Sequence, residues 1–360
     1  MAHYKIGILH GDDIGLEVVP VAIEVLKTAV EKYKSVEIEW HELPIGYSSY
    51  LKNGETLPKS TFDSLFSLDG WILGPIGHMA YPKDDPKAVN PHPILRRSFD
   101  LVSNIRPVKS YENIPSIHKN VDLVIVRENN EGFQPDRNMY KGKGEFMPTP
   151  DMALSVRVIT ERNSKMVAET AFELARQRNR KKKVTAIHKN TVFKLTCGLF
   201  VDSCREKSKE YPDIEFDTMI VDTFAMNLVM RPQNFDVVVT TNMFGDILSD
   251  EAAGLVGGLG MAPGLCVGPK YAMAQATHGS APDIAGKHIA NPYAMVMSAQ
   301  MLLSWLGNMK GDTDAVNASK DIEFGVNKVL YEKKHLTPDL SGTSTTEDMG
   351  RAICDAIKNI

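Results

Sequence analysis

The stretch KIGILHGDDIGLEVVPVAIEVLKTAVEKY, residues 5–33, carries the first signal of the fold, because it reads as a strand, a turn and a helix. Residues Lys5–His10 predict the strand, and Gly11–Gly15 predict the turn. From Glu17 onward, apolar residues return at helical spacing, at Val18, Ala22, Val25, Leu26 and Ala29. Proline is tolerated in the first turn of a helix, so Pro20 places the start of this helix just before it.

The same alternation of strands and helices continues along the chain. Further strands are predicted at Val36–Leu43, Gly70–Leu73, Val121–Arg127, Val184–Ile187, Thr218–Val221 and Phe235–Thr241. Further helices are predicted at Lys59–Ser67, Asn163–Arg178, Phe193–Glu210 and Asn291–Leu306. In the last of these, Asn291 and Pro292 are typical of an N-cap and the first helical position. Strands that alternate with helices favour an α/β fold with a largely parallel sheet.

Length and composition limit the class of protein. The chain has 360 residues, which favours about two domains. It is 43% hydrophobic and 24% charged, so it can bury a substantial core. Lys and Arg number 41 against 45 Asp and Glu, a net charge of -4, whereas nucleic-acid binders usually carry a basic excess. We therefore expect no nucleic-acid partner.

The sequence favours a cytoplasmic location. The first twenty residues contain one lysine and three acidic residues, and they lack the layout of a secretory signal. The uncharged stretches 252–269 and 293–309 are broken by Gly and Pro or fall short of a bilayer span, so we expect no membrane partner. The cysteines form no CxxC pair, which disfavours zinc and indicates a reducing compartment; they are Cys197, Cys204, Cys266 and Cys354.

The segment NMFGDILSD, residues 242–250, places Asp246 and Asp250 four residues apart. If a helix starts here, both carboxylates lie on one face, where they repel unless a cation lies between them. A hard divalent cation such as Mg²⁺ or Mn²⁺ binds oxygen ligands of this kind. The alternative is that Asp246 caps the helix and Asp250 is solvated. Asp222 ends a predicted strand, and it is either a third metal ligand or another N-cap.

Three arginines stand at the edges of apolar segments. Arg96 and Arg106 lie within LRRSFDLVSNIRP, residues 95–107, and Arg127 follows an apolar strand. Arginines in such places suit bidentate capture of carboxylates, although buried structural ion pairs give the same pattern. Lys189 also follows a strand. It is either an ordinary exposed lysine or a general base whose neutral form is favoured by burial and a nearby cation.

The segment THGSAPDIAGKHIANP, residues 277–292, is rich in small residues, which let a backbone approach a ligand closely. His278 can stack on a base or hydrogen-bond to it, and Asp283 can accept from ribose hydroxyls. An acidic residue here would repel a 2′-phosphate, which favours NAD over NADP. The alternative is an ordinary glycine-rich loop. The first glycines of the chain lack GxGxxG spacing, so a Rossmann fingerprint is not predicted.

Together these segments resemble the metal-dependent β-decarboxylating dehydrogenases, the family of isocitrate, isopropylmalate, homoisocitrate and tartrate/D-malate dehydrogenases. The matching pieces are HGDDIGLEV, LRRSFDLVSNIRP, VRENNEG, HKNT, VDTFAMNLV, FDVVVTTNMFGDILSDEAAGLVGGLG and HGSAPDIAGKHIANP. The resemblance implies an isopropylmalate dehydrogenase-like two-domain fold, non-Rossmann, with mixed or parallel sheets and flanking helices. Residues 1–104 plus 257–360 would form the cofactor-binding large domain. Residues 105–256 would form the substrate, metal and dimerisation domain, with an arm near 135–157.

The resemblance also implies a reaction, the oxidative decarboxylation of a malate-like 2-hydroxy acid with NAD and Mg²⁺ or Mn²⁺. The enzyme would be a homodimer whose active sites are built by both subunits. Substrate binding would fall to Asn90, Arg96, Arg106 and Arg127, and NAD binding to His278, Gly279, Ser280, Asp283 and Asn291. Metal binding would fall to Asp246 and Asp250 with Asp222 of the other subunit. The catalytic residues would be Lys189 and Asp222, with Lys189, also from the other subunit, assisting deprotonation of the substrate hydroxyl.

One departure from the family pattern concerns the proton donor. Gln134 stands where the family usually has a tyrosine seven residues after the arginine of the VRE motif, and that tyrosine is the expected donor to the enolate. A glutamine cannot act as an acid near neutral pH. Tyr140 is nearby in sequence. Two hypotheses therefore stay open: an active decarboxylating dehydrogenase, or a non-catalytic or regulatory homologue.

Further departures concern the substrate and the loops. Isopropylmalate enzymes have a leucine pair at the positions of His92 and Pro93, and with Asn90 the polar rim here does not suit an isopropyl group. Isocitrate, D-malate or tartrate, and other 3-substituted malates stay open. Asp13 replaces a glycine in the first loop, and Asp tolerates positive φ better than β-branched residues do. The sequence AQA at 274–276 replaces a usual Phe-Glu-Pro or Phe-Glu-Ser, which points to altered cofactor affinity.

Overall fold

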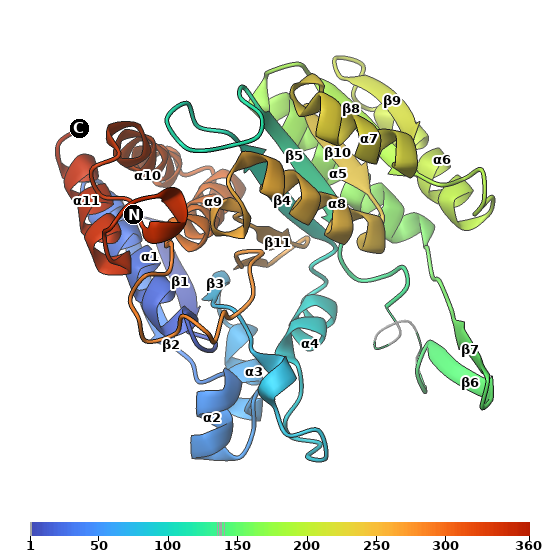
Figure 1. Ribbon diagram of the computed structural model, residues 1–360, viewed down its shortest axis with the longest axis horizontal. Helices are drawn as coiled ribbons and strands as arrows, with labels where there is room; N and C mark the ends of the chain where they lie inside the picture. The colour runs from blue at the N-terminus through green and yellow to red at the C-terminus, as the bar shows by residue number, and fades with distance from the viewer. Residues whose placement is uncertain (1, 135, 137–138, 140) are drawn as a thin grey trace.

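The computed structural model describes residues 2–134, 136, 139 and 141–360, and its centre is a ten-stranded sheet (Figure 1). The strands are β1 (Ala2–Leu9), β2 (Val36–Glu42), β3 (Gly70–Leu73), β4 (Ser103–Lys109), β5 (Asp122–Glu128), β8 (Lys183–His188), β9 (Glu215–Ile220), β10 (Val237–Thr240), β11 (Leu265–Val267) and β12 (Ala272–Ala274). Their order across the sheet is β2-β1-β3-β12-β11-β4-β5-β10-β8-β9. A separate two-stranded ribbon consists of β6 (Glu145–Thr149) and β7 (Met152–Ser155).

Helices cover both faces of the large sheet. They are α1 (Gly15–Val30), α2 (Gly46–Asn53), α3 (Lys59–Leu65), α4 (Pro91–Ser98), α5 (Glu161–Arg178), α6 (Thr196–Ser208), α7 (Val221–Met230), α8 (Asn242–Val256), α9 (Tyr293–Lys310), α10 (Thr313–Glu332) and α11 (Thr346–Lys358). Short 3-10 turns lie at His78–Ala80, Pro232–Asn234, Leu259–Met261 and Pro338–Leu340. The predicted α/β fold is confirmed.

The sheet is parallel at both ends and antiparallel in the middle. The neighbours from β2 to β12 run parallel, and so do those from β5 to β9. The central pairs β12–β11, β11–β4 and β4–β5 are antiparallel, and the two parallel ends run in opposite directions as a result. The sequence pattern predicted the outer strands but missed β4, β11 and β12, because two of them are only three residues long.

The strand order follows the predicted division of the chain. The strands of residues 1–104 and 257–360 lie at one end of the sheet, and those of residues 105–256 lie at the other, with β4 across the first boundary. The chain crosses near Ile105, inside β4, and returns near Gly257, at the end of α8. The assignment of the two halves as separate domains stays a prediction.

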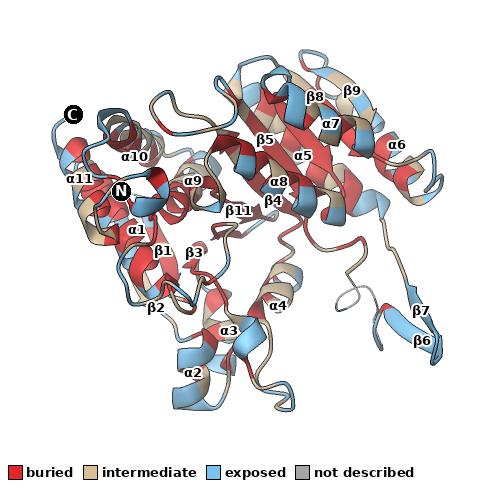
Figure 2. Ribbon diagram, viewed as in Figure 1, coloured by how far each residue is buried: buried red, intermediate tan, exposed pale blue. Residues whose placement is uncertain are grey.

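Two layers of helices pack on opposite faces. On one face, α1, α9, α10, α11 and α5 share a continuous apolar core that includes Leu26, Phe172 and Leu302. On the other face, α3 and α4 pack around Trp71 and Phe99 at one end, while α7 and α8 pack around Phe224 at the other. Figure 2 shows that buried residues concentrate on the sheet and on the sides of the helices that face it. On this second face a space remains between the helices α3 and α4 at one end and α7 and α8 at the other. The candidate site lies in this space.

Four predicted helix starts differ from the structure. Two of these helices, α5 and α6, begin at Glu161 and Thr196 rather than at Asn163 and Phe193. Helix α1 begins at Gly15, so Pro20 lies beyond its first turn. Proline has no backbone N–H, so Pro20 cannot donate the helical hydrogen bond to the Leu16 carbonyl. Both residues are exposed, so water can bond to that carbonyl instead. Helix α9 begins at Tyr293, with Pro292 as its N-cap, one residue later than predicted. The Asn291 side chain still accepts a hydrogen bond from the Tyr293 N–H, at 3.0 Å.

The ribbon of β6 and β7 stands away from the rest of the molecule (Figure 1). Every residue of both strands is exposed, including the apolar Phe146, Met147, Met152 and Leu154. It lies inside the segment where an arm is predicted.

All four cysteines are buried and free. Among the helices of the described residues, none is both long and apolar enough to cross a membrane.

Candidate active site

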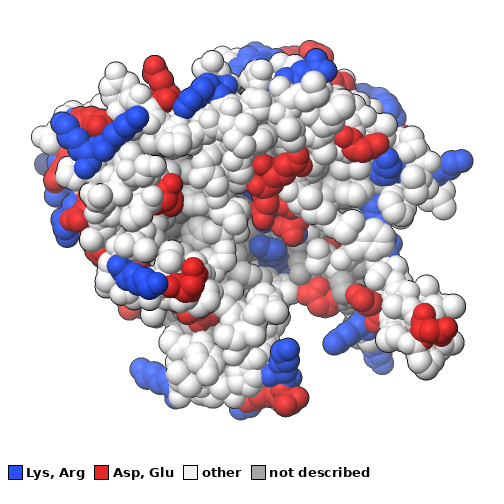
Figure 3. Space-filling model, in the orientation of Figure 1, with Lys and Arg blue, Asp and Glu red and all other residues white. Residues whose placement is uncertain are grey.

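A cavity of about 420 Å³ lies on the second face of the sheet, between α4 and α8. It collects residues from segments far apart in the sequence. Its lining includes Asn90, His92, Arg96, Asn104, Arg106, Arg127, Gln134, Asp246, Gln275, His278 and Gly279. Figure 3 shows this region as a hollow with basic atoms at its floor and acidic atoms beside it.

The arginines reach the cavity because of strand pairing. Asn104 on β4 lies opposite Arg127 on β5, and Arg106 lies two residues further along β4, so these side chains share one face. Arg106 is 6% exposed and Arg127 is 4% exposed. Burial lowers the pKa of Arg127 to about 9, with the nearby Arg106 charge as a second cause. Burial also lowers the pKa of Arg106, partly offset by Asp246. Arg127 therefore remains cationic at neutral pH.

The two carboxylates of α8 face these arginines. Asp246 accepts hydrogen bonds from Arg127 and from Arg106, the latter at 3.3 Å, and Asp250 lies 3.6 Å from Arg106. Burial raises the pKa of Asp250, and the Asp246 charge adds to that effect while the arginines oppose it. Helix α8 begins at Asn242, so Asp246 lies inside the helix and the alternative of an N-cap is wrong. The prediction that both carboxylates share one helix face is confirmed.

Neutral polar side chains accept the remaining hydrogen bonds of the buried guanidinium groups. Asn242 accepts from Arg127 Nε at 3.0 Å and from Nη2 at 2.5 Å, and Ser249 accepts from Arg106 at 2.6 Å. Gln134 donates to the same Asn242 oxygen at 3.2 Å, which places it at the cavity. Sequence reasoning missed Asn104, Asn242 and Ser249, because short polar residues carry no distinctive spacing. Tyr140 lies outside the described residues.

Lys189 and Asp222 are close to each other but do not line the cavity. Lys189 follows β8 and donates to Asp222, in the first turn of α7, at 2.7 Å. This hydrogen bond lowers the pKa of Asp222. In the described part of the chain, no group of three His, Cys, Asp or Glu side chains is placed to hold a metal ion. One chain therefore brings Asp246 and Asp250 together but not Asp222.

The glycine-rich segment borders the cavity on the side of α4. His278 and Gly279 line it, and the buried His278 Nε2 has no hydrogen-bond partner among the described residues. Burial lowers the pKa of His278, which favours the neutral imidazole. Ser280 is buried and its carbonyl accepts from the Ile14 N–H at 3.2 Å, whereas Asp283 is exposed. Asn291 is buried and donates to Asp339 at 2.9 Å.

The first loop is organised by Asp12, whose role the sequence did not reveal. Asp12 is buried and accepts from the Gly77 N–H at 2.8 Å, the Tyr47 N–H at 2.6 Å and the Tyr81 hydroxyl at 2.5 Å. It thereby ties the turn after β1 to the turn after β3, beside the glycine-rich segment. Asp13 adopts a φ of +51°, as expected from its tolerance of that conformation.

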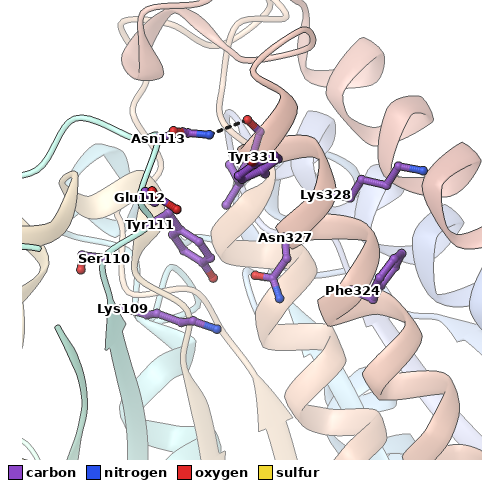
Figure 4. Close-up of a pocket in the computed structure, with 10 residues that line it drawn as sticks. Lys109, Ser110, Tyr111, Glu112, Asn113, Phe324, Asn327, Lys328 and Tyr331 are labelled. Atoms are coloured by element: carbon purple, nitrogen blue, oxygen red, sulfur yellow. Dashed lines mark hydrogen bonds between the residues drawn. The ribbon is translucent and has the colours of Figure 1, made fainter. Parts of the chain in front are cut away.

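A second cavity, of about 500 Å³, lies elsewhere, between residues 109–113 and helix α10 (Figure 4). Its walls include Tyr111, Phe324 and Tyr331, and Asn113 bridges them by donating to the Tyr331 carbonyl at 2.8 Å. It contains none of the arginines or aspartates discussed above. Its size is greater, but of these two cavities the one beside α8 joins the buried cations Arg106 and Arg127, the carboxylate of Asp246 and the glycine-rich segment. We therefore take the cavity beside α8 as the candidate active site.

Comparison with known proteins identifies the family of the chain. A family model described as Isocitrate/isopropylmalate dehydrogenase matches residues 5–353. The chain belongs to this family. It is therefore an oxidoreductase, and the predicted family resemblance is confirmed.

Individual relatives cover almost the whole chain. An isocitrate/homoisocitrate dehydrogenase from Thermus thermophilus is 40% identical, with 99% of each chain covered. A 3-isopropylmalate dehydrogenase from Methanothermobacter thermautotrophicus is 39% identical, with 98% of each chain covered. The crystal structure of isocitrate dehydrogenase from Methylococcus capsulatus matches with a TM-score of 0.83 at 38% identity, covering 99% of each chain. The relatives carry different substrate names, so they leave the substrate of this chain open.

Gly245 provides a test of how Arg127 is held. A Cβ atom at Gly245 would lie 2.6 Å from Arg127 Cγ and 2.7 Å from its Cβ, so Gly245→Ala must displace the arginine. We expect a loss of stability of about 1–3 kcal/mol and at least about tenfold weaker binding of a dicarboxylate. Chemical denaturation and calorimetry measure the two effects.

Gly254→Ala is the matched control, because it lies in the same helix with nothing within 4 Å of the added Cβ. We expect it to leave binding unchanged and stability unchanged or higher by up to about 1 kcal/mol. Equal binding losses in both variants would contradict the role given to Gly245.

Proposed function

We propose that this protein catalyses the NAD-dependent oxidative decarboxylation of a malate-like 2-hydroxy acid with Mg²⁺ or Mn²⁺. The observation that carries the proposal is the meeting of buried Arg106 and Arg127 with Asp246 in one cavity bordered by His278. Buried cations suit substrate carboxylates, and a half-exposed carboxylate beside them suits a metal ion. Family membership supports the same reaction class.

The arginines would bind the substrate carboxylates and fix the position of the C2 carbon. Arg106 and Arg127 are already held in place by Asn242 and Ser249, so little side-chain freedom is lost when the acid binds. Arg96 would bind from the α4 side. Asn90 caps α4 by accepting from the His92 N–H at 3.1 Å, and it faces the same cavity.

The side chains fit a divalent cation. Asp246 and Asp250 are about half exposed, with relative side-chain exposures of 54% and 52%, so their outer oxygens are accessible. Mg²⁺ commonly uses one or two protein carboxylates, with the remaining positions filled by substrate and water. When bound, the cation would act as a Lewis acid that stabilises negative charge on the substrate oxygens. The positive charge would also relieve the repulsion between the two aspartates.

The glycine-rich segment supports NAD as the cofactor. His278 offers a buried nitrogen, Nε2, that has no hydrogen-bond partner in the part of the chain the structure describes, and Asp283 offers an exposed carboxylate a few residues later. Gly279 has nothing within 4 Å of the position a Cβ would take, so a bound group can approach the backbone there. NAD would accept the hydride from C2. The Ser280 carbonyl accepts from the Ile14 N–H and the Asn291 amide donates to Asp339, so these two groups already have partners within the protein.

We propose a homodimer in which Lys189 and Asp222 complete the site of the other subunit. Both lie outside the cavity of their own chain, although the family resemblance assigns them to catalysis. Apolar side chains are exposed on α7 and α8 at Met226, Val229, Met230, Met243 and Ile247, and on the β6–β7 ribbon. A second copy is the simplest way to cover these surfaces. The cytoplasmic location stays a prediction.

A regulatory or non-catalytic role is the alternative, and Gln134 is the observation that favours it. Gln134 lies at the cavity and donates to Asn242, but it cannot supply a proton as an acid. The direct test incubates the protein with Mn²⁺, NAD and a panel of isocitrate, homoisocitrate, 3-isopropylmalate, D-malate and tartrate. NADH formation with one acid supports the enzyme. Binding of the acids without any NADH supports the alternative.

Replacement of Asp246 tests the metal site. We expect Asp246→Asn to weaken Mn²⁺ binding by about tenfold or more, because a charged oxygen ligand is lost. Calorimetric titration with Mn²⁺ measures this without any turnover. Asp202→Asn, an exposed aspartate on α6, is the control and leaves affinity unchanged. Unaltered Mn²⁺ affinity and turnover in Asp246→Asn would reject the metal assignment.

Mixing of two inactive variants tests the shared site. Lys189→Met and Asp246→Asn each damage both sites of their own homodimer. A mixed dimer keeps one intact site if Lys189 acts across the interface, so co-expression should restore about a quarter of wild-type activity. The readout is NADH formation by the purified mixture. No recovery despite proven mixed dimers would place Lys189 in the site of its own chain.

Restoration of the family tyrosine tests the proton donor. Oxidation without loss of CO₂ releases the intact keto acid, whereas complete turnover releases the decarboxylated product. We expect Gln134→Tyr to raise the ratio of decarboxylated product to intact keto acid by about tenfold or more, since a positioned acid would protonate the enolate. Gln134→Phe supplies the ring without the hydroxyl and should leave the ratio near the wild-type value. If the ratio is the same in Gln134→Tyr and the wild type, the lack of an acid at position 134 does not slow protonation of the enolate.

A further inference from the structure

Arg157 lies where the chain returns from the β6–β7 ribbon to helix α5 (Figure 1). The backbone on either side of it is hydrogen-bonded to the chain that leads into the ribbon. The Val156 N–H donates to the Gly144 carbonyl at 2.7 Å, and Val158 exchanges two hydrogen bonds with Gly132, at 2.8 and 3.1 Å. These four residues form the base of the ribbon, and they set the position of Arg157.

The guanidinium group of Arg157 is held by neutral polar groups. Its Nη1 donates to the Thr196 hydroxyl at 3.0 Å and to Cys197 Sγ at 3.2 Å, both at the start of α6. Its Nη2 donates to the Thr241 hydroxyl at 3.2 Å, just before α8. These three partners belong to two different helices, so the arginine joins the base of the ribbon to both of them.

Three aromatic rings surround the same guanidinium group. Its central carbon lies 4.8 Å from the centre of the Phe193 ring, 5.5 Å from that of Phe244 and 5.6 Å from that of Phe133. A guanidinium group is planar, so it can stack on rings and donate hydrogen bonds in its own plane at the same time, whereas a lysine ammonium group cannot. This set of partners therefore suits arginine in particular.

The contacts of Arg157 fix the turn that carries Lys189. The Lys189 N–H donates to Cys197 Sγ at 3.3 Å, and this sulfur is the one that accepts from Arg157. The Lys189 carbonyl accepts from the Phe193 N–H at 2.9 Å, and the Phe193 ring lies against the guanidinium group. Arg157 is thus joined to both ends of residues 189–193, which we call the lysine turn.

Arg157 also contacts α8, through Thr241 and Phe244. That helix has a further attachment close by, because its Asn242 accepts from Arg127 Nε at 3.0 Å. Loss of the Arg157 contacts should therefore disturb the lysine turn more than it disturbs α8.

We propose that Arg157 is a positioning residue for Lys189, which it holds by fixing the lysine turn to the base of the ribbon. This rests on the proposed function, in which Lys189 assists deprotonation of the substrate hydroxyl in the site of the other subunit. A group that moves a proton must lie within hydrogen-bond reach of that proton. Displacement of the turn by about 1 Å should therefore cost up to about a hundredfold in rate. Affinity for the acid should be kept, because Arg106 and Arg127 are held by other residues.

Two substitutions test this role through kcat and KM, measured with the acid of the panel that gives NADH. We expect Arg157→Met to lower kcat by about thirtyfold or more and to change KM by less than about threefold. Arg157→Lys keeps the charge near the rings but cannot donate to Cys197 and Thr241 together, so kcat should fall by about threefold to tenfold. Arg205→Met is the matched control and leaves both constants unchanged, since Arg205 is an exposed residue of α6 that pairs with Asp202 of the same helix.

Mixed dimers show which part of the site the arginine serves. If Arg157 acts through Lys189 of its own chain, a chain with Arg157→Met still has an intact Asp246. Co-expression with Asp246→Asn then leaves one complete site in each mixed dimer and should restore about a quarter of wild-type activity. Co-expression with Lys189→Met leaves no complete site, so activity should not exceed that of Arg157→Met alone. A mere loss of stability would lower the activity of both mixtures alike. Arg157→Lys replaces Arg157→Met in these mixtures if the latter does not fold.

The outcomes distinguish this inference from the proposed function. Recovery with Asp246→Asn but not with Lys189→Met supports the inference. Recovery with Lys189→Met only would assign Arg157 to the side of α8 and overturn it. A kcat within about threefold of wild type in Arg157→Met, or in Arg157→Lys if Arg157→Met does not fold, would also overturn it, even if chemical denaturation shows a loss of stability. A wild-type protein that forms no NADH with any acid of the panel would overturn the proposed function and this inference together.

Discussion

The antiparallel pairing of β4 with β5 is the constraint on which the candidate site depends. It places two guanidiniums in the middle of a sheet, where burial is costly unless charge and hydrogen bonds compensate it. Helix α8 supplies that compensation through Asn242, Asp246 and Ser249. Because Gly245 has no side chain, α8 can approach Arg127 closely enough to do so. If α8 moved away from β5, the buried guanidinium groups would lose their hydrogen-bond and charge partners.

The register of the central strands brings the two halves of the chain to one place. Ala274 lies opposite Leu265, Leu265 opposite Ile105, and Ile105 opposite Val126. Gln275, Arg106 and Arg127 are sequence neighbours of residues in this row. Their side chains therefore lie close to one another at the cavity. Two parallel halves that run in opposite directions need such an antiparallel centre, and the cavity forms where their helices leave the face uncovered.

The distribution of charge supports the proposal that one cavity binds an acid, a metal ion and a cofactor. The buried arginines favour carboxylates, and the exposed oxygens of Asp246 and Asp250 favour a cation. Beside them, burial lowers the pKa of His278, and the backbone of Gly279 is open to a bound group. The net charge of -4 is spread over the whole surface and says nothing about this arrangement. Function here depends on local pairing of charges rather than on their sum.

The sequence by itself determined the α/β class, the family, and the carboxylate pair Asp246 and Asp250, because helical spacing puts residues four apart on one face whatever surrounds them. It also marked Gln134 as an exception. Tertiary structure alone decided that Gln275 binds Arg96 and that Asp12 joins the turns after β1 and β3. The physical reason is that strand register and helix packing join residues almost two hundred positions apart, and no local pattern of spacing records such contacts.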